Sequence, residues 1–281
     1  METTLFATSA HSNRSLPGAA AGGWLRILHR TNPVLSWSGW VSLGLAAGAL
    51  VLLPLDSRLV TGAPVWLKPL KFGLSITAFT WTLGWLLADL PAAVQRSVRR
   101  ISWGVAVSMA VELSVLFVQA ARGTTSHYNQ TSLLNGMLFS LMGLFILLNT
   151  GLLVWATVLA WRHRPHGPAG YVWGLRLGLL LFVLGSVLGG AMVGLSRHTV
   201  GAPDGGPGLP GLGWSTRAGD LRIAHFLGLH ALQVVPLLGW ALSRWVPRRA
   251  ARLTWAGALA YAALVAGLFG QALAGVPLIS R

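Results

Sequence analysis

The sequence predicts an all-α polytopic integral membrane protein: a bundle of seven transmembrane helices with the N-terminus in the cytoplasm and the C-terminus outside. Composition is the first reason, because 54% of the 281 residues are hydrophobic, only 10% are charged and the mean hydropathy is +0.63. The second reason is that seven apolar runs approach the roughly 20 residues that a spanning helix needs. The chain has no cysteine, which excludes disulfides, thiolate catalysis and cysteine-ligated metals.

The distribution of basic residues and tryptophans predicts the orientation. Thirteen of the 21 Arg and Lys residues fall in the N-terminal segment and in the second, fourth and sixth connections or beside them, which therefore face the cytoplasm. Scattered basic residues of this kind are typical of topology signals and not of a nucleic-acid surface. The tryptophans expected at the cytoplasmic interface are Trp24, Trp37, Trp40, Trp85, Trp103, Trp161, Trp173, Trp240, Trp245 and Trp255.

The organisation is one transmembrane domain over residues 33–276, between a cytoplasmic tail (1–32, with a short interfacial segment) and an extracytoplasmic tail (277–281). The expected spans are Val34–Pro54, Trp66–Leu90, Ile101–Ala121, Ser132–Trp161, Tyr171–Leu195, Asp220–Trp245 and Ala251–Gly275. We expect no cleaved signal peptide, because the first twenty residues lack an apolar core.

The first, fifth and seventh spans have the composition of a scaffold. Small residues four apart allow helices to approach closely. Such pairs are Gly44/Gly48 in the first span and Gly174/Gly178, Gly185/Gly189 and Gly190/Gly194 in the fifth. The seventh span contains no lysine that would hold a retinal Schiff base.

The second span begins with two lysines. Lys68, Lys71 and Ser75 are spaced i, i+3, i+7 and therefore share one helical face. Pro69 suits a first helical turn. Lys68 can extend to the headgroups as an ordinary interfacial lysine, but Lys71 lies almost a turn deeper.

The third span carries the one acidic residue deep in the predicted membrane. Glu112, Gln119 and Arg122 follow one stripe, and Glu112 is about 15 Å below Arg122. A cation nearby would hold the carboxylate ionised, and we expect Lys71 to be that partner. A purely structural Glu–Lys pair is the alternative.

The fourth span is overlong and is expected to tilt. Asn149 and Thr150 are its polar residues at depth.

The sixth span presents a polar arc. Counted from Asp220, the side chains of Arg222, His225, His230 and Gln233 fall within an arc about 140° wide. Asp220 begins the helix, where a carboxylate is also a plain N-cap. A lone buried histidine is commonly a packing residue, but two histidines on one arc with Arg and Gln favour a site.

Two outer connections differ from simple turns. Residues 122–131 include His127 and Asn129, and residues 201–213 read GAPDGGPGLPGLG, which is too rich in Gly and Pro for regular structure. The second loop continues through Arg217 into Asp220. Each loop adjoins a span that carries charge into the membrane, so we expect both loops to contribute to one polar pocket open to the outside.

These residues form the predicted site. The expected catalytic residues are Glu112, His230, His225 and Asp220. The expected substrate-binding residues are Lys68, Lys71, Gln119, Arg122, His127, Asn129, Arg217, Arg222 and Gln233. No metal site is predicted, because zinc and di-iron centres need more carboxylates and closer histidine spacing. The sequence does not identify a cofactor, and a haem between His127 and His225 is a geometrically possible alternative.

The excess of cations over carboxylates in this site favours an anionic ligand. The leading hypothesis is a membrane-embedded enzyme of the cell membrane that performs acid/base proton transfer on a lipid-soluble, anionic substrate from the outer side. The alternatives are a proton-coupled transporter with Glu112 and His230 as relay, and a binding or accessory membrane subunit. The expected partners are the lipid bilayer and a hydrophobic or anionic small molecule or lipid, and not nucleic acid.

Overall fold

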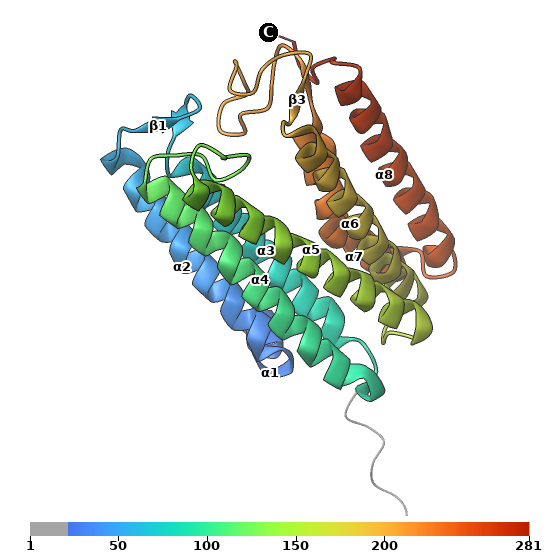
Figure 1. The fold of residues 1–281 in the computed structure, drawn as a ribbon. Coiled ribbons are helices and arrows are strands. Elements are labelled where there is room, and N and C mark those ends of the chain that lie inside the picture. Colours follow the sequence, from blue (N-terminus) through green and yellow to red (C-terminus); the bar gives the residue numbers. More distant parts are fainter. Residues whose placement is uncertain (1–21, 281) are drawn as a thin grey trace, which may run out of the picture.

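The computed structural model describes residues 22–280 of the chain as a bundle of helices (Figure 1). The predicted cytoplasmic tail up to residue 21, with Arg14, and the terminal Arg281 lie outside the described residues. The helices are α1 (Gly22–Thr31), α2 (Pro33–Leu55), α3 (Leu67–Ala88), α4 (Gln95–Ala121), α5 (Leu133–Arg162), α6 (Ala169–Leu195), α7 (Leu221–Trp245) and α8 (Ala250–Leu273), with a 3-10 turn η1 (Ala92–Val94) before α4. The strands are β1 (Leu59–Val60), β2 (Ala63–Pro64), β3 (Thr199–Val200) and β4 (Gly219–Asp220), and they form two short antiparallel pairs.

The all-α membrane fold is confirmed, but the number of described helices that meet the criteria for a span is six and not the predicted seven. Within residues 22–280, six helices are long and apolar enough to cross a membrane: α2, the α4 segment with its η1 turn, and α5 to α8. The expected second span, α3, has the length at 22 residues but not the same apolar character. Lys68, Lys71 and a series of threonines reduce its hydropathy. It packs against α2, α4 and α7 within the bundle.

The helices form two groups. One contains α2, α3, α4 and α5, with α1 against α2 and α3; the other contains α6, α7 and α8. The groups meet along α5 and α6 and, over a smaller area, along α3 and α7. Phe79 of α3 and Phe182 of α6 stack across this boundary with ring centroids 5.1 Å apart. The largest buried cluster, mostly of Leu, Ile, Val and Met side chains, extends from the first group into α6 and α7, and a smaller one lies within α6, α7 and α8.

Glycine explains the close packing of α6 on α7. A Cβ atom added at Gly185 would lie 2.5 Å from the backbone of Gly228, and one at Gly174 would lie 2.7 Å from the carbonyl oxygen of Val235. Only glycine allows backbones this close. Four of the predicted small-residue pair members therefore pack against α7: Gly174, Gly178, Gly185 and Gly189.

The same prediction is wrong for the remaining pairs. A Cβ atom added at Gly44 or Gly48 of α2, or at Gly190 or Gly194 of α6, would have no atom of another described helix within 4 Å. Spacing alone does not tell which face of an apolar helix meets another helix, since both faces are apolar when lipid covers one of them.

The connections alternate between two ends of the bundle. We call the basic end the one that carries α1 and the connections 89–94, 163–168 and 246–249. The loop end carries the β-hairpin connection 56–66, the 122–132 loop, the 196–220 loop and the chain after α8 (Figure 1). This division matches the two sides deduced from the sequence; which end faces the cytoplasm stays a prediction.

Candidate functional site

Three ionisable side chains meet beneath the loop end. Lys68 lies in the first turn of α3, His127 in the 122–132 loop and Glu112 on α4. The Lys68 Nζ is 3.1 Å from the His127 Nδ1, and the His127 Nε2 is 3.9 Å from the Glu112 Oε1. Lys68 is also near enough to Glu112 to attract it electrostatically. We call Lys68, His127 and Glu112 the central triad.

The geometry assigns the protons of His127. An ammonium group can only donate, so Lys68 donates to Nδ1 and the ring proton resides on Nε2, which faces Glu112. The Ser126 hydroxyl also lies 3.1 Å from Nδ1. Burial, and then the positive charge of Lys68, lower the pKa of His127 well below its ordinary value, so the imidazole is neutral at pH 7.

Glu112 is the group in the triad with an unused atom. Its side chain is 3% exposed, and its Oε2 has no hydrogen-bond partner within residues 22–280. The contact of Oε1 with His127 is too long for a hydrogen bond. A buried carboxylate with such weak local support is costly, and charges at membrane depth are commonly functional.

Aromatic rings surround His127. Phe72, Tyr128 and Phe139 have ring centroids 6.0, 6.1 and 6.2 Å from the His127 ring. Tyr128 has a φ of 57°, a left-handed conformation that non-glycine residues rarely adopt. This strained residue follows His127 directly and directs the loop across the site.

Three predicted substrate-binding residues make hydrogen bonds that hold the 122–132 loop in place; their role toward a substrate stays a prediction. Gln119 is fully buried and donates to the Asn135 Oδ1 over 3.1 Å, and the Arg122 Nη1 donates to the Gln119 Oε1 over 2.6 Å. The Asn129 amide donates to the Thr125 carbonyl oxygen over 2.8 Å. Their polar atoms act within the protein, and they position His127.

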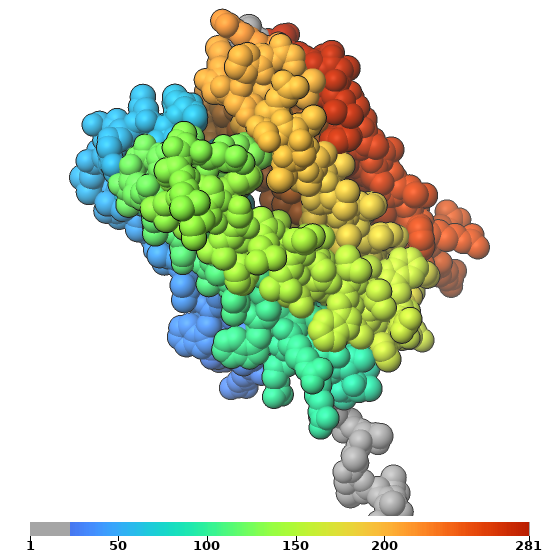
Figure 2. All heavy atoms as spheres, viewed as in Figure 1, coloured from blue at the N-terminus to red at the C-terminus, as the bar shows by residue number. Residues whose placement is uncertain are grey.

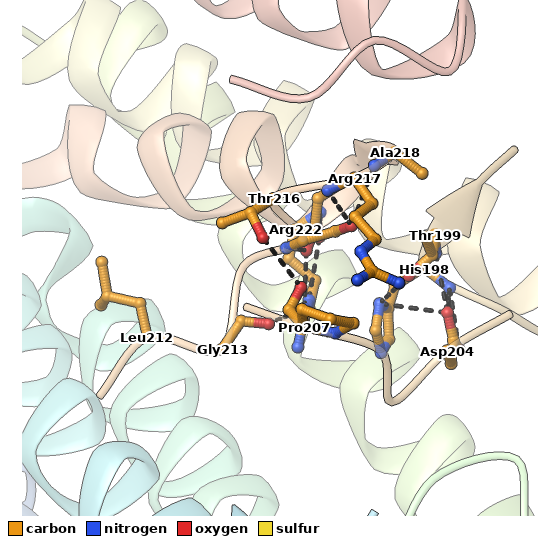
Figure 3. Close-up of polar contacts among 12 residues, drawn as sticks. His198, Thr199, Asp204, Pro207, Leu212, Gly213, Thr216, Arg217, Ala218 and Arg222 are labelled. Atoms are coloured by element: carbon orange, nitrogen blue, oxygen red, sulfur yellow. Dashed lines mark hydrogen bonds and ion pairs between the residues drawn. The ribbon is translucent and has the colours of Figure 1, made fainter. Parts of the chain in front are cut away.

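A second centre of charge begins α7 (Figure 3). Asp220 caps the helix and receives two charge-assisted hydrogen bonds from Arg222, Nε to Oδ1 at 2.9 Å and Nη2 to Oδ2 at 2.6 Å. The Ser215 N–H donates to Oδ2 over 2.8 Å, and the Arg222 Nη2 also donates to the Gly213 carbonyl oxygen. Burial alone would raise the pKa of Asp220, but these hydrogen bonds outweigh it and lower the pKa. This ion pair folds the 196–220 loop onto the helix start.

Lys71 links the two helix groups and does not pair with Glu112, the carboxylate expected from the sequence. Its Nζ donates to the Leu212 carbonyl oxygen over 3.2 Å, which joins α3 to the 196–220 loop. The expectation that Lys71 is the cation beside Glu112 is therefore wrong. The cation that interacts with Glu112 is Lys68. Lys68 contacts His127 in the 122–132 loop, whereas Lys71, three residues on, bonds to Leu212 in the 196–220 loop.

The deeper residues of α7 make their hydrogen bonds and ring contacts outside the central triad. The His225 Nδ1 is 2.8 Å from the Gly185 carbonyl oxygen, and the His230 ring packs on Phe226 with centroids 4.1 Å apart. The Gln233 Nε2 contacts the Thr82 hydroxyl at 3.4 Å. No hydrogen bond or ion pair links these residues to Glu112 in the described part of the chain. Arg217 is exposed on the 196–220 loop and lies among the residues drawn in Figure 3.

The structure adds residues that sequence reasoning missed. The His198 Nδ1 is 3.3 Å from the Asp204 Oδ1, and Asp204 also accepts from the Thr199 N–H over 2.9 Å. His198 is close enough to Lys68 and Arg222 to interact with their charges. Burial, the largest influence, lowers the pKa of His198. Its position immediately after a span, on the predicted outer side, was the signal in the sequence that could have identified it.

Charged side chains of the two helix groups therefore lie close to one another near the loop end. Lys68, Lys71 and Arg222 lie within electrostatic range of one another, and His127 lies within range of His198 and His225. Figure 2 shows the surface hollowed where the green 122–132 loop faces the gold 196–220 loop. Within residues 22–280, no group of three His, Asp or Glu side chains is placed to hold a metal ion.

The fold and this polar region define a multi-pass helical membrane protein with buried charge near one end of the bundle. No family model, curated protein or solved structure matches the chain. Its function must therefore be argued from the arrangement of its residues.

Proposed function

We propose that the protein is a membrane-embedded enzyme that performs acid/base chemistry on a lipid-soluble substrate with an anionic group. The observation that carries this proposal is the central triad, in which the buried Glu112 has a free Oε2 beside a neutral His127. A carboxylate with an available oxygen can accept or donate a proton at a bound substrate.

The triad supports a division of roles. Glu112 exchanges a proton with the substrate through Oε2, and the His127 Nε2–H faces the opposite oxygen and stabilises its negative charge. Lys68 fixes the ring by donating to Nδ1. His127 thereby takes the role of relay partner that the sequence suggested for His230, whose ring packs on Phe226.

Charge supports an anionic substrate. Arg222 is matched by Asp220 and Lys68 by Glu112, whereas Lys71 has only a backbone carbonyl as its hydrogen-bond partner within residues 22–280. Two of its three N–H donors remain for a ligand. Lys71 therefore anchors the anionic group of the substrate where the two helix groups meet, and the aromatic rings of Phe72, Tyr128 and Phe139 contact its apolar part.

The test uses purified protein in detergent, mixed with a total lipid extract of the host membrane and analysed by untargeted mass spectrometry. The wild-type protein should convert at least one lipid-soluble anion, and Glu112→Gln should not. Ser108→Ala is the matched control: it lies one turn from Glu112 on α4, and its hydroxyl bonds only the Gly104 carbonyl. Conversion by Glu112→Gln at the wild-type rate would reject the role of Glu112.

A proton-coupled carrier is the second candidate, favoured by a specific observation. Asn149 on α5 and Gln233 on α7 each have a buried carbonyl oxygen without a partner among the described residues. Both lie near the middle of their helices, so polar groups continue below Glu112. A carrier needs access from both sides of the membrane. Function that appears only in sealed vesicles, and stops when the proton gradient is dissipated, would favour this candidate over the enzyme.

The proposal places the loop end on the extracytoplasmic side of the cell membrane, following the basic-residue asymmetry. Cysteines introduced at Ser97 and Ser215 lie at opposite ends of the bundle, so a membrane-impermeant thiol reagent added outside intact cells should label Ser215→Cys only. Labelling of both positions from one side would reject the topology.

A further inference from the structure

At the basic end, far along the helices from the central triad, an arginine lies among tryptophans. The Arg176 guanidinium is 5.1 Å from the ring centre of Trp173 and 6.0 Å from that of Trp161. Trp173 contacts both Trp161 and Trp255, with centroids 5.8 and 5.1 Å apart. The rings come from α5, α6 and α8 and form a continuous aromatic row where the three helices meet.

Arg176 uses only part of its donor capacity inside the protein. Its Nε donates to the Ala160 carbonyl oxygen over 2.9 Å, which satisfies one of the free carbonyls at the end of α5. Its terminal nitrogens have no hydrogen bond to another residue in the described range, and no carboxylate pairs with it there. The side chain is half-buried and the two Nη groups remain as a fork.

A second arginine borders the same row. Arg252 precedes Trp255 by three residues on α8, so the two lie on one helical face, and the Arg252 side chain is exposed. Basic residues outnumber acidic ones at this end of the bundle. The described acidic residue of the basic end is Asp89, which accepts a hydrogen bond from the Tyr171 hydroxyl over 2.6 Å.

We propose that Arg176, Arg252 and the row of Trp161, Trp173 and Trp255 form a binding site for an anionic phospholipid. A guanidinium fork matches two phosphate oxygens, and tryptophan rings suit the depth at which the glycerol backbone meets the acyl chains. The exposed positive charge favours a lipid with net negative charge over a zwitterionic one. The site is independent of the proposed enzyme activity.

Native mass spectrometry of the protein in detergent tests this site, with phosphatidylglycerol and phosphatidylcholine of the same acyl chains as probes. The wild-type protein should bind phosphatidylglycerol more tightly, and Arg176→Gln should weaken that binding by about tenfold while leaving phosphatidylcholine binding unchanged. Arg99→Gln is the control, because Arg99 is exposed at the same end and has no ring contact in the described structure.

Two results would overturn the proposal: no preference for phosphatidylglycerol in the wild type, or equal losses in Arg99→Gln and Arg176→Gln, which would indicate diffuse attraction to the basic end. If Arg176→Gln does not fold because the end of α5 loses its hydrogen bond, then Arg252→Gln and Trp173→Leu decide. Both should weaken phosphatidylglycerol binding, and wild-type binding in both would overturn the site.

Discussion

Glu112 and Asp220 are both buried carboxylates near the loop end, yet their surroundings are opposite. Both Asp220 oxygens accept hydrogen bonds, from the Arg222 guanidinium and from backbone N–H groups. Glu112 has a histidine at 3.9 Å on one oxygen and no partner in the described chain on the other. A fully bonded carboxylate stabilises a fold, whereas a buried carboxylate with a free oxygen leaves an interaction to be completed by a ligand.

This difference divides the predicted site into two parts. Asp220 and Arg222 fold the 196–220 loop, and Gln119, Arg122 and Asn129 fold the 122–132 loop. The first loop carries His198 and accepts a hydrogen bond from Lys71 at the Leu212 carbonyl, and the second carries His127. Many of the clustered polar residues therefore hold the two loops in place through hydrogen bonds within the protein.

Replacement of Glu112 should give the largest functional effect with little structural cost. Glu112→Gln keeps the shape and removes a carboxylate whose Oε2 has no hydrogen bond in the described chain, but it also takes the opposite charge from Lys68, so the thermal midpoint should change little while activity falls to background. Thermal unfolding followed by tryptophan fluorescence, beside the lipid-conversion assay, measures both. A strong drop in the midpoint would instead make Glu112 a structural residue like Asp220.

Replacement of Asp220 should give the largest loss of stability. Asp220→Ala leaves Arg222 without its partner and removes the cap of α7, at a cost of about 3 kcal/mol, the low end for a buried pair because the Arg222 side chain is 32% exposed. Denaturant titration at pH 7 measures this difference.

The pH dependence of that difference gives an internal control. The folded protein lowers the pKa of Asp220, so the stabilisation is present above the unfolded value near 3.9 and is lost as pH falls through the folded value. The gap between wild type and Asp220→Ala should therefore close only in acid. A gap that closes between pH 5 and 7 would contradict the assignment to this ion pair.

Lys68→Met should raise the pKa of His127, and this effect should be smaller than those of the two carboxylate substitutions. Burial is the main cause of the low pKa of His127 and the Lys68 charge is the next, so removal of the charge should raise the pKa without restoring its ordinary value. Nitrogen NMR of labelled histidine follows the ring directly, with Lys71→Met as the control. An equal shift in Lys71→Met would contradict the pairing of His127 with Lys68.

The sequence predicted the helical bundle and the end that carries the polar site, because spans and intramembrane charges follow from hydropathy alone. It also placed Glu112 at depth on α4. It did not predict which cation faces Glu112: Lys68 and Lys71 share a helical face, and only the packing of α3 between α4 and α7 separates their directions.

The contacts made by loop residues could not be predicted from hydropathy or helical periodicity. His127 lies beside Glu112 because the loop turns at Tyr128 in a left-handed conformation, and no periodicity records such a turn. Asp204 and His198 meet across the bend of a Gly/Pro-rich loop for the same reason. Partners within regular helices are set by periodicity, whereas partners in loops depend on turn geometry.

Asp56 extends the comparison to a carboxylate near the surface and should show the smallest effect. It accepts hydrogen bonds from the Arg58 guanidinium at 2.7–3.2 Å and from the Trp66 indole at 2.8 Å, and the hydrogen bond from Arg58 holds its pKa well below the ordinary value. Asp56→Asn keeps the shape but weakens these bonds, so the thermal midpoint should fall less than in Asp220→Ala. Because water and salt screen exposed pairs, the remaining difference should shrink further in high salt, whereas that of Asp220→Ala should persist. A salt-independent loss as large as that of Asp220→Ala would show that hydrogen bonding of the carboxylate, and not its burial, sets the structural cost.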